Sequence, residues 1–183
     1  TFVNKIDHFG KNPFDLIADI EDVLGIRSCP MNWPIGINGN YTGIFDRETE
    51  IAHLFIKDNA HGTKKLEVVS GKLTDEAITS RLDPDIISSL KDDLELLEEA
   101  GDPFDAQRVA SGELTPMFFG SAMTNFGVEP FLKKFLELAP PPMERKTLEG
   151  SVSPENPAFS GFVFKIQANM DPRHRDRIAF MRI

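Results

Sequence analysis

The sequence has one cysteine, one tryptophan and one tyrosine among its 183 residues, and it has no long apolar run. A single cysteine cannot form an internal disulfide, which fits a reducing compartment. One cysteine and four scattered histidines offer no metal-ligand spacing, so we expect no metal site. No apolar run approaches the roughly 20 residues that cross a bilayer, and residues 1–5 do not resemble a signal peptide. These absences predict a cytoplasmic protein that has no membrane partner.

The negative charge is confined to one part of the chain. The formal net charge is −9. Between residues 75 and 113, twelve acidic residues stand against three basic ones, a local balance of −9 that equals the whole net charge. An acidic run of this kind is either a solvated helix face or a surface for a basic partner, and both interpretations stay open. Residues 159–183 carry five basic against two acidic residues, +3, which leaves RNA contact open as well.

Both ends of the sequence read as interrupted strands. The chain has no initiator methionine, and residues 1–3 look like the last residues of a buried strand. Residues 178–183 form a strand-like pattern that no turn follows. We therefore expect this chain to be an internal fragment of a longer protein.

The spacing of apolar residues predicts a mixed α/β chain. Asn12 followed by Pro13 is a typical helix start, and Gly25 is a typical helix end. Proline and glycine between residues 30 and 43 predict a long loop. Helices are expected at 13–24, 83–100, 104–110 and 128–139, and strands at 1–3, 26–31, 43–45, 51–56, 66–69, 115–119, 162–167 and 178–181.

Asn4-Lys5-Ile6-Asp7 follows a predicted strand and precedes a predicted helix, the setting of the NKxD guanine motif. Guanine presents N1–H beside its exocyclic amine, and the Asp7 carboxylate can accept both hydrogen bonds. Adenine lacks that N1–H, so the carboxylate would stay unpaired. Asn4 can tie the base edge to neighbouring loops, and the stem of Lys5 can lie along the base or ribose. The alternative is that Asp7 simply caps a helix.

Gly120-Ser121-Ala122 also follows a predicted strand and precedes a helix. It is similar to the fifth GTPase motif, in which the backbone N–H of Ala122 meets guanine O6 and Ser121 steadies the loop and the aspartate. The alternative for this tripeptide is an ordinary turn. Two such motifs in order at strand ends favour a nucleotide site, because ligands of open α/β sheets bind there.

Asp7 and Ser121 are separated by 114 positions, many more than one helix and one strand require. The additional residues between them resemble an inserted subdomain. Four segments of the sequence also resemble the release factor 3 family of translational GTPases, and the resemblance covers essentially the whole chain. The segments are residues 29–36, 115–122, 125–128 and 162–172.

The resemblance implies the C-terminal half of a P-loop GTPase domain with an inserted α+β subdomain, followed by the first strands of a β-barrel. The implied boundaries are a partial GTP-binding domain at 1–139, with the inserted subdomain at about 33–113, a linker at 140–157, and a truncated barrel domain at 158–183. It also implies a cytoplasmic, ribosome-dependent GTPase that binds GTP and GDP and promotes the departure of class I release factors. The implied guanine-binding residues are Asn4, Lys5, Asp7, Ser121 and Ala122.

Other parts of a GTPase are missing from the sequence. It has no GxxxxGKS or GxxxxGKT loop, and neither a DxxG switch motif nor a switch threonine can be assigned. Phosphoryl transfer depends on that loop, its lysine, Mg²⁺ ligands and a positioned water. We name no catalytic residue, expect Mg²⁺ only in the intact protein, and expect the chain alone to be inactive and to bind GDP weakly.

Two alternatives remain open at this point. One is an elongation factor G-like or ribosomal protection GTPase. The other is a non-enzymatic module in which the acidic helix at 83–100 docks on the ribosomal stalk protein. Ribosomal RNA contact through Arg173, Arg175 and Arg177 is a further hypothesis, with a charged hairpin turn as its alternative.

Overall fold

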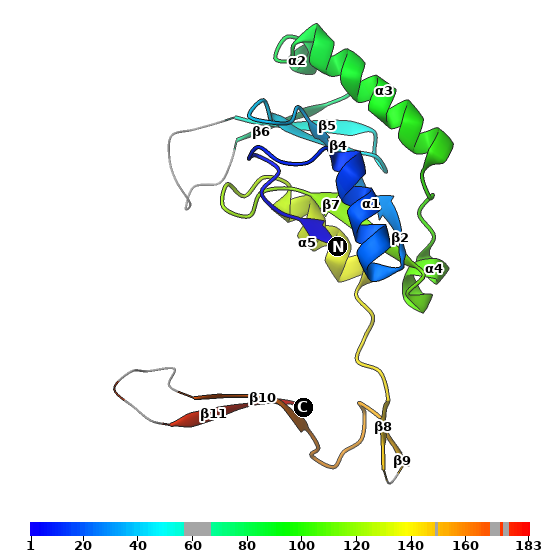
Figure 1. Ribbon diagram of the computed structural model, residues 1–183, viewed down its shortest axis with the longest axis vertical. Coiled ribbons are helices and arrows are strands. Elements are labelled where there is room, and N and C mark those ends of the chain that lie inside the picture. The colour runs from blue at the N-terminus through cyan, green and yellow to red at the C-terminus, as the bar shows by residue number, and fades with distance from the viewer. Residues whose placement is uncertain (57–66, 149, 169–172, 174–175) are drawn as a thin grey trace. The chain divides into compact units, whose positions relative to one another are not determined.

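The computed structural model describes residues 1–56, 67–148, 150–168, 173 and 176–183. These residues form two compact units, Thr1–Ala139 and Pro140–Ile183. The mixed α/β character predicted from the sequence is confirmed (Figure 1). Among the described residues, no helix is long and apolar enough to cross a membrane.

A three-stranded parallel sheet lies at the centre of the first unit. Its strands are β1 (Phe2–Val3), β7 (Leu114–Phe119) and β2 (Arg27–Pro30), in the order β1-β7-β2. Helix α1 (Pro13–Leu24) connects β1 to β2. It begins and ends as the sequence predicts: Asn12 Oδ1 accepts a hydrogen bond from the Phe14 N–H at 2.9 Å, and Gly25 adopts the left-handed conformation with φ of 68°.

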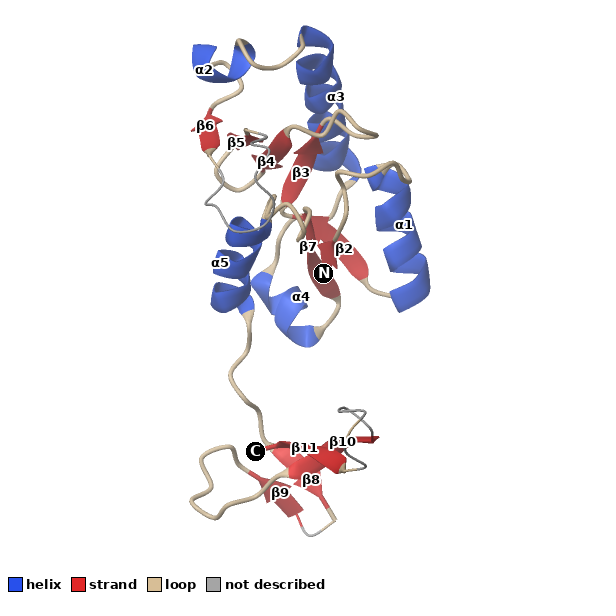
Figure 2. Ribbon diagram, turned by 90° about the vertical axis from the view of Figure 1, so that its left-hand side faces the viewer, coloured by secondary structure: helices blue, strands red, loops and turns tan. Residues whose placement is uncertain are grey.

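Helices α1 and α5 (Val128–Leu138) cover opposite faces of this sheet (Figure 2). Successive residues of a strand point to opposite faces, and the two phenylalanines at the end of β7 show this. Phe118 packs on Phe131 of α5, with ring centroids 5.4 Å apart. Phe119 packs on Trp33 at 5.3 Å, and Trp33 in turn contacts Phe14 of α1 at 4.7 Å.

The second sheet of this unit is antiparallel and four-stranded. Its strands are β3 (Asn32–Ile35), β4 (Gly43–Asp46), β5 (Ile51–Phe55) and β6 (Val68–Gly71), in that order. The predicted β4–β5 hairpin is confirmed. The predicted long loop from residue 30 is wrong over β3. Pro34 argued against a strand because it has no N–H to donate, but β3 is an edge strand of this sheet, where that donor is not needed.

Three helices follow β6. They are α2 (Glu76–Thr79), α3 (Pro84–Ala100) and α4 (Ala106–Ser111). Helix α3 matches its prediction, because Asp83 accepts from the Asp85 N–H at 2.9 Å, and Leu90 and Leu97 are buried. Trp33 donates its indole N–H to Asp93 of α3 at 3.0 Å. The short helix α2 was not predicted from the sequence.

An ionic cluster fixes the segment before β7 to the edge of the parallel sheet. The Asp102 carboxylate accepts from Arg108 at 2.8 Å and from Arg27 of β2 at 2.7 Å. The hydrogen bond from Arg108, together with Arg27, lowers the pKa of Asp102 against the opposing effect of burial. Glu21 of α1 completes the cluster by accepting from Arg27 at 2.6 Å.

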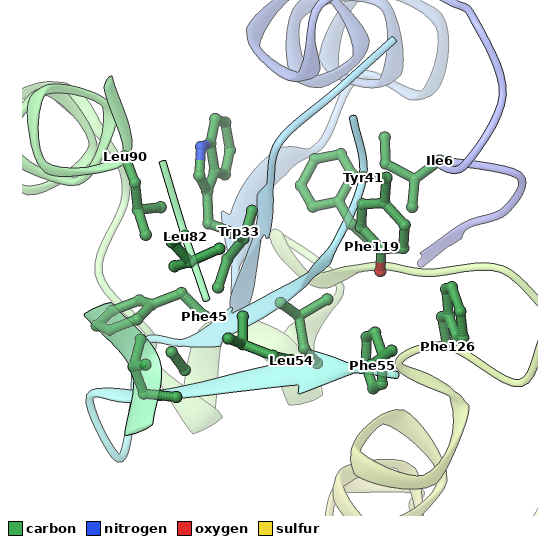
Figure 3. Close-up of a cluster of buried hydrophobic side chains, with 14 of the residues drawn as sticks. Ile6, Trp33, Tyr41, Phe45, Leu54, Phe55, Leu82, Leu90, Phe119 and Phe126 are labelled. Carbon is green, nitrogen blue, oxygen red and sulfur yellow. The ribbon is translucent and has the colours of Figure 1, made fainter. Parts of the chain in front are cut away.

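A large buried cluster joins the two sheets of the first unit (Figure 3). Trp33, Ile35 and Ile44 of the antiparallel sheet are 1 % exposed or less, and so are Met117 and Phe119 of β7. Because the parallel and antiparallel sheets share one core, residues of the antiparallel sheet can reach the strand ends of the parallel one.

The described residues of the second unit form two hairpins. Strands β8 (Arg145–Thr147) and β9 (Gly150–Val152) form the first, which lies within the range predicted as a linker. Strands β10 (Phe162–Ala168) and β11 (Arg177–Arg182) form the second, as predicted. Of the basic residues in the intervening turn, Arg175 lies outside the described residues.

Candidate guanine-binding site

The two predicted guanine motifs leave the parallel sheet at the same edge. In the ladder between β1 and β7, Phe2 pairs with Phe118 and Val3 pairs with Phe119. The Gly120 N–H donates to Val3 O at 3.0 Å, and the Ile6 N–H donates to Gly120 O at 3.2 Å. The segments 4–7 and 120–122 therefore lie side by side beyond the carboxyl ends of their strands, where ligands of such sheets bind.

Asn4 joins the two motifs directly. Its Oδ1 accepts hydrogen bonds from the Lys5 N–H and from the Ala122 N–H, each at 2.9 Å. The role expected of Asn4 in tying neighbouring loops together fits this geometry. The Ala122 N–H, however, donates to Asn4 here, so guanine O6 would have to share this donor with Asn4 Oδ1 or displace it.

Lys5 has a left-handed backbone, with φ of 67°. This conformation is uncommon for a residue with a side chain and is concentrated at functional sites. It lets the chain turn sharply, so that the His8 N–H donates to Lys5 O at 3.0 Å and Ile6 enters the core. The Lys5 side chain remains exposed beside the turn.

Asp7 has an acceptor atom that nothing in the described chain satisfies. Its side chain is 21 % exposed, yet its Oδ1 is buried and has no hydrogen-bond partner. The other oxygen, Oδ2, lies 3.8 Å from His8 Nε2, which is too far for a hydrogen bond. Buried acceptors without partners are rare in folded proteins. An orphaned carboxylate oxygen fits a ligand edge that carries N–H groups, as guanine does.

Ser121 and its neighbours form a tightly held loop. Ser121 is 1 % exposed and exchanges two backbone hydrogen bonds with Phe126, at 2.8 and 3.0 Å. A Cβ on Gly120 would come within 2.5 Å of Phe126 O and 2.8 Å of the Phe2 ring, so only glycine fits there. The loop therefore holds Ala122 in a fixed place relative to Asn4.

Sequence reasoning missed two residues at this site, Asn32 and Tyr41. Both come from the segment of the chain around the start of the predicted inserted subdomain. The Asn32 side chain is 3 % exposed and clamps the last residue of β7: its Nδ2 donates to Phe119 O at 3.1 Å, and the Phe119 N–H donates to its Oδ1 at 2.7 Å. A single amide inside the apolar run from Cys29 to Ile35 was the available signal.

The site offers hydrogen-bonding groups for a base but no recognisable group for phosphates or a metal among the residues that the structure describes. In that part of the chain, no group of three or more histidine, cysteine, aspartate or glutamate side chains could hold a metal ion. Chemically, the site can recognise the edge of a purine through the Asp7 carboxylate and through Asn4 and Ala122, which are hydrogen-bonded to each other.

Comparison with known sequences finds relatives that are named as peptide chain release factors. It is 53 % identical over 184 residues to peptide chain release factor 3 of Symbiobacterium thermophilum. It is 50 % and 49 % identical over 183 residues to the proteins of the same name from Trichodesmium erythraeum and Gloeothece citriformis. Over its whole length, the chain is thus similar to proteins named peptide chain release factor 3. All of the chain is matched in each case, but it spans only 34 % of each relative's length.

Two further comparisons concern the fold and the family models. A crystal structure of a Thermus thermophilus protein aligns with 99 % of this chain, at a TM-score of 0.53 and 22 % identity. The chain covers 26 % of that protein, and the likeness is one of fold alone. No protein-family model matches the chain.

Proposed function

We propose that this chain is the guanine-reading part of a ribosome-dependent GTPase that promotes the release of class I release factors. The relatives support the biological role, because they carry the name release factor 3. The observation that carries the biochemical role is the buried, unpartnered Asp7 Oδ1 beside the Asn4–Ala122 hydrogen bond. The names of the relatives do not favour the elongation factor G-like alternative.

The elements of the chain can be assigned to parts of the intact GTPase. Strands β1 and β7 are neighbouring strands of a P-loop GTPase sheet, and β3–β6 with α2–α4 form the inserted subdomain. Strands β10 and β11 begin a β-barrel. The boundary between Ala139 and Pro140 supports the end of the GTP-binding domain in this proposal, and the second unit takes in both the predicted linker and the barrel strands.

The bound nucleotide is GTP or GDP, and the chain supplies only its base specificity. Asp7 accepts from guanine N1–H and the exocyclic amine, and Asn4, Lys5, Ser121 and Ala122 shape the rest of the base pocket. The phosphate loop, the switch segments and the Mg²⁺ ligands come from sequence outside this chain. When bound, Mg²⁺ neutralises phosphate charge during hydrolysis.

The test uses a full-length chimera, in which residues 1–183 replace the matching 184 residues of the Symbiobacterium thermophilum protein. We expect the chimera to bind GDP at least about 100-fold more tightly than ADP, because an unpaired carboxylate rejects adenine. We also expect ribosomes to stimulate its GTP hydrolysis and the departure of a class I release factor. Titration with fluorescent nucleotides and a release-factor recycling assay measure these properties. Equal affinity for GDP and ADP would contradict the proposal.

The 183-residue chain is the natural control for this experiment. Because it has no phosphate-binding loop, we expect its affinity for GDP to be far below that of the chimera. Submicromolar GDP binding by the chain alone would show that this account of its affinity is wrong.

The acidic face of α3 supports a second proposal, that this helix docks on the ribosomal stalk protein. Asp92, Glu95, Glu98 and Glu99 are exposed along the helix. Asp93 differs from them, because it accepts the Trp33 indole hydrogen bond and so belongs to the core contact. A docking surface for a basic partner should therefore consist of the exposed acids without Asp93.

Replacing Asp92, Glu95 and Glu99 by lysine in the chimera is expected to abolish salt-sensitive binding to the stalk protein, because the attraction becomes repulsion. Surface plasmon resonance at two ionic strengths measures this. The matched control places the same change in charge on the exposed residues Asp22, Glu144 and Glu155. If the α3 variant binds as well as the control, the acids serve only to solvate the helix.

A further inference from the structure

Three buried side-chain atoms of the described chain have no hydrogen-bond partner: Asp7 Oδ1, Ser28 Oγ and Tyr41 Oη. Each such atom destabilises the folded state, because it has lost its water and gained nothing in return. Orphaned atoms of this kind call for an explanation, and a functional site is one. Asp7 belongs to the candidate guanine site, and Tyr41 shares a buried cluster with Ile6, the chain neighbour of Asp7.

Tyr41 follows the loop from Gly36 to Asn40, and this loop lies against the turn that contains Asp7. The Gly10 N–H donates to Asn38 Oδ1 at 3.1 Å. The Phe9 ring lies 3.2 Å from the point where a Cβ on Gly39 would be. The loop between β3 and β4 therefore contacts the turn that contains Asp7. Residues 36–41 lie beside the two predicted guanine motifs, 4–7 and 120–122.

The Tyr41 ring is held firmly in the core. It is 1 % exposed and packs against Phe55 at 6.4 Å and Phe126 at 5.8 Å between ring centroids. Phe126 is the residue that closes the Ser121 loop through its two backbone hydrogen bonds. Figure 3 shows Tyr41 beside Ile6, the neighbour of Asp7, and beside Phe119 at the end of β7.

The Tyr41 hydroxyl can act as a donor at any working pH. Burial, and secondly the negative charge of Asp7, raise the pKa of Tyr41 far above its ordinary value. The phenol therefore stays protonated. The segments that carry the two groups pack together, because Gly10 donates to Asn38, and Ile6 shares one buried cluster with Tyr41.

We propose that Tyr41 is a positioning residue for guanine recognition, whose hydroxyl donates to the Asp7 carboxylate when the base is bound. This inference rests on the proposed function. A carboxylate has about four acceptor positions, and the guanine edge takes only two of them. Tyr41 approaches from the core and supplies a third donor, which orients the carboxylate toward the base. When guanine binds, Asp7 Oδ1 and Tyr41 Oη both gain the hydrogen-bond partners that they lack without it.

Replacing Tyr41 by phenylalanine should weaken GDP binding without lowering the Tm, unlike the same change at a core tyrosine whose hydroxyl only stabilises the fold. Tyr41→Phe removes only the hydroxyl, so the nucleotide-free protein loses an unsatisfied buried group and its Tm should stay the same or rise. The guanine-bound protein loses a hydrogen bond to a charged group. We therefore expect GDP affinity to fall about tenfold or more.

The experiment measures the Tm without nucleotide and the Kd for GDP in the full-length chimera and its variants. Ser28→Ala is the matched control, since it removes the other orphaned hydroxyl, from β2, where Ser28 pairs with Thr115 of β7. We expect this control to leave GDP affinity within about twofold, because distant sites act independently. In a chimera that carries Asp7→Ala, Tyr41→Phe is expected to have no further effect on GDP affinity.

The outcomes distinguish this inference from the function on which it rests. GDP affinity of Tyr41→Phe within about twofold of the unchanged chimera would overturn the role of Tyr41 and leave guanine recognition intact. A parallel fall in Tm and affinity would also overturn it, because the hydroxyl would then be structural. An unchanged chimera that does not prefer GDP to ADP would refute both proposals.

Discussion

Replacing Asp7 by asparagine in the full-length chimera is expected to invert its base preference from GDP to xanthosine diphosphate. The introduced amide would place its NH₂ against the exocyclic amine of guanine, donor against donor. Xanthine has a carbonyl at that position and keeps N1–H, so an asparagine amide can pair with both. A site built on paired donors and acceptors discriminates strongly, so we expect GDP affinity to fall at least about 100-fold. Competition titration with both nucleotides measures the inversion.

The matched control for this change is Asp22→Asn on α1, where the side chain is exposed and away from the strand ends. It removes the same charge and should leave both affinities unchanged. If Asp7→Asn weakens GDP and xanthosine diphosphate equally, Asp7 does not read the base edge, and its buried oxygen needs another explanation.

Asn32→Asp is expected to destabilise the fold strongly, although it is a conservative change. The amide of Asn32 gives one hydrogen bond to the backbone of Phe119 and receives one from it. The introduced carboxylate cannot donate, so it would face Phe119 O with a buried negative charge. Leaving a buried charge without compensation typically costs about 3–5 kcal/mol. Urea unfolding at pH 7 measures this, and the buried Trp33 next to Asn32 reports it through its fluorescence.

Asn40→Asp provides the control, because Asn40 is exposed and its side chain is outside the core. A surface change of this kind alters the free energy of unfolding by about 0.5 kcal/mol or less. A loss of under about 1 kcal/mol for Asn32→Asp would show that the clamp on Phe119 contributes little, since even one unsatisfied buried group costs that much.

The elements that could be predicted from the sequence are those whose formation depends on neighbouring residues, such as helix caps and turns. Helix α1 carries its cap at Asn12 and its stop at Gly25, and α3 carries Asp83 followed by Pro84. The β4–β5 hairpin follows from two apolar segments around a polar turn. Strand β3 was missed because Pro34 is unfavourable in most strands. Its partner strand and its position at the edge of the sheet, where proline is tolerated, are set by the whole fold.

The same distinction applies to the site. Asn4, Lys5, Asp7, Ser121 and Ala122 could be predicted because a motif and a strand end can be recognised from short stretches of sequence. The hydrogen bond from Ala122 to Asn4 joins residues 118 positions apart and could be seen only in the structure. Tyr41 has no local signature in the sequence, and Asn32 has only the weak one of a single amide in an apolar run, because the surroundings of both residues are set by two sheets that share one core.

The clamp at Asn32 also has a consequence for mechanics. As the chain leaves β2, the Met31 N–H still donates to Met117 O, and the Asn32 side chain then takes the position that a further peptide group would hold beside Phe119. A side chain thus extends the ladder while the backbone turns into the antiparallel sheet. The two sheets cannot hinge at this point without breaking both Asn32 bonds. A force applied to α3 would reach Phe119, the last residue of β7, through the Asp93–Trp33 hydrogen bond and the contact between the Trp33 and Phe119 rings.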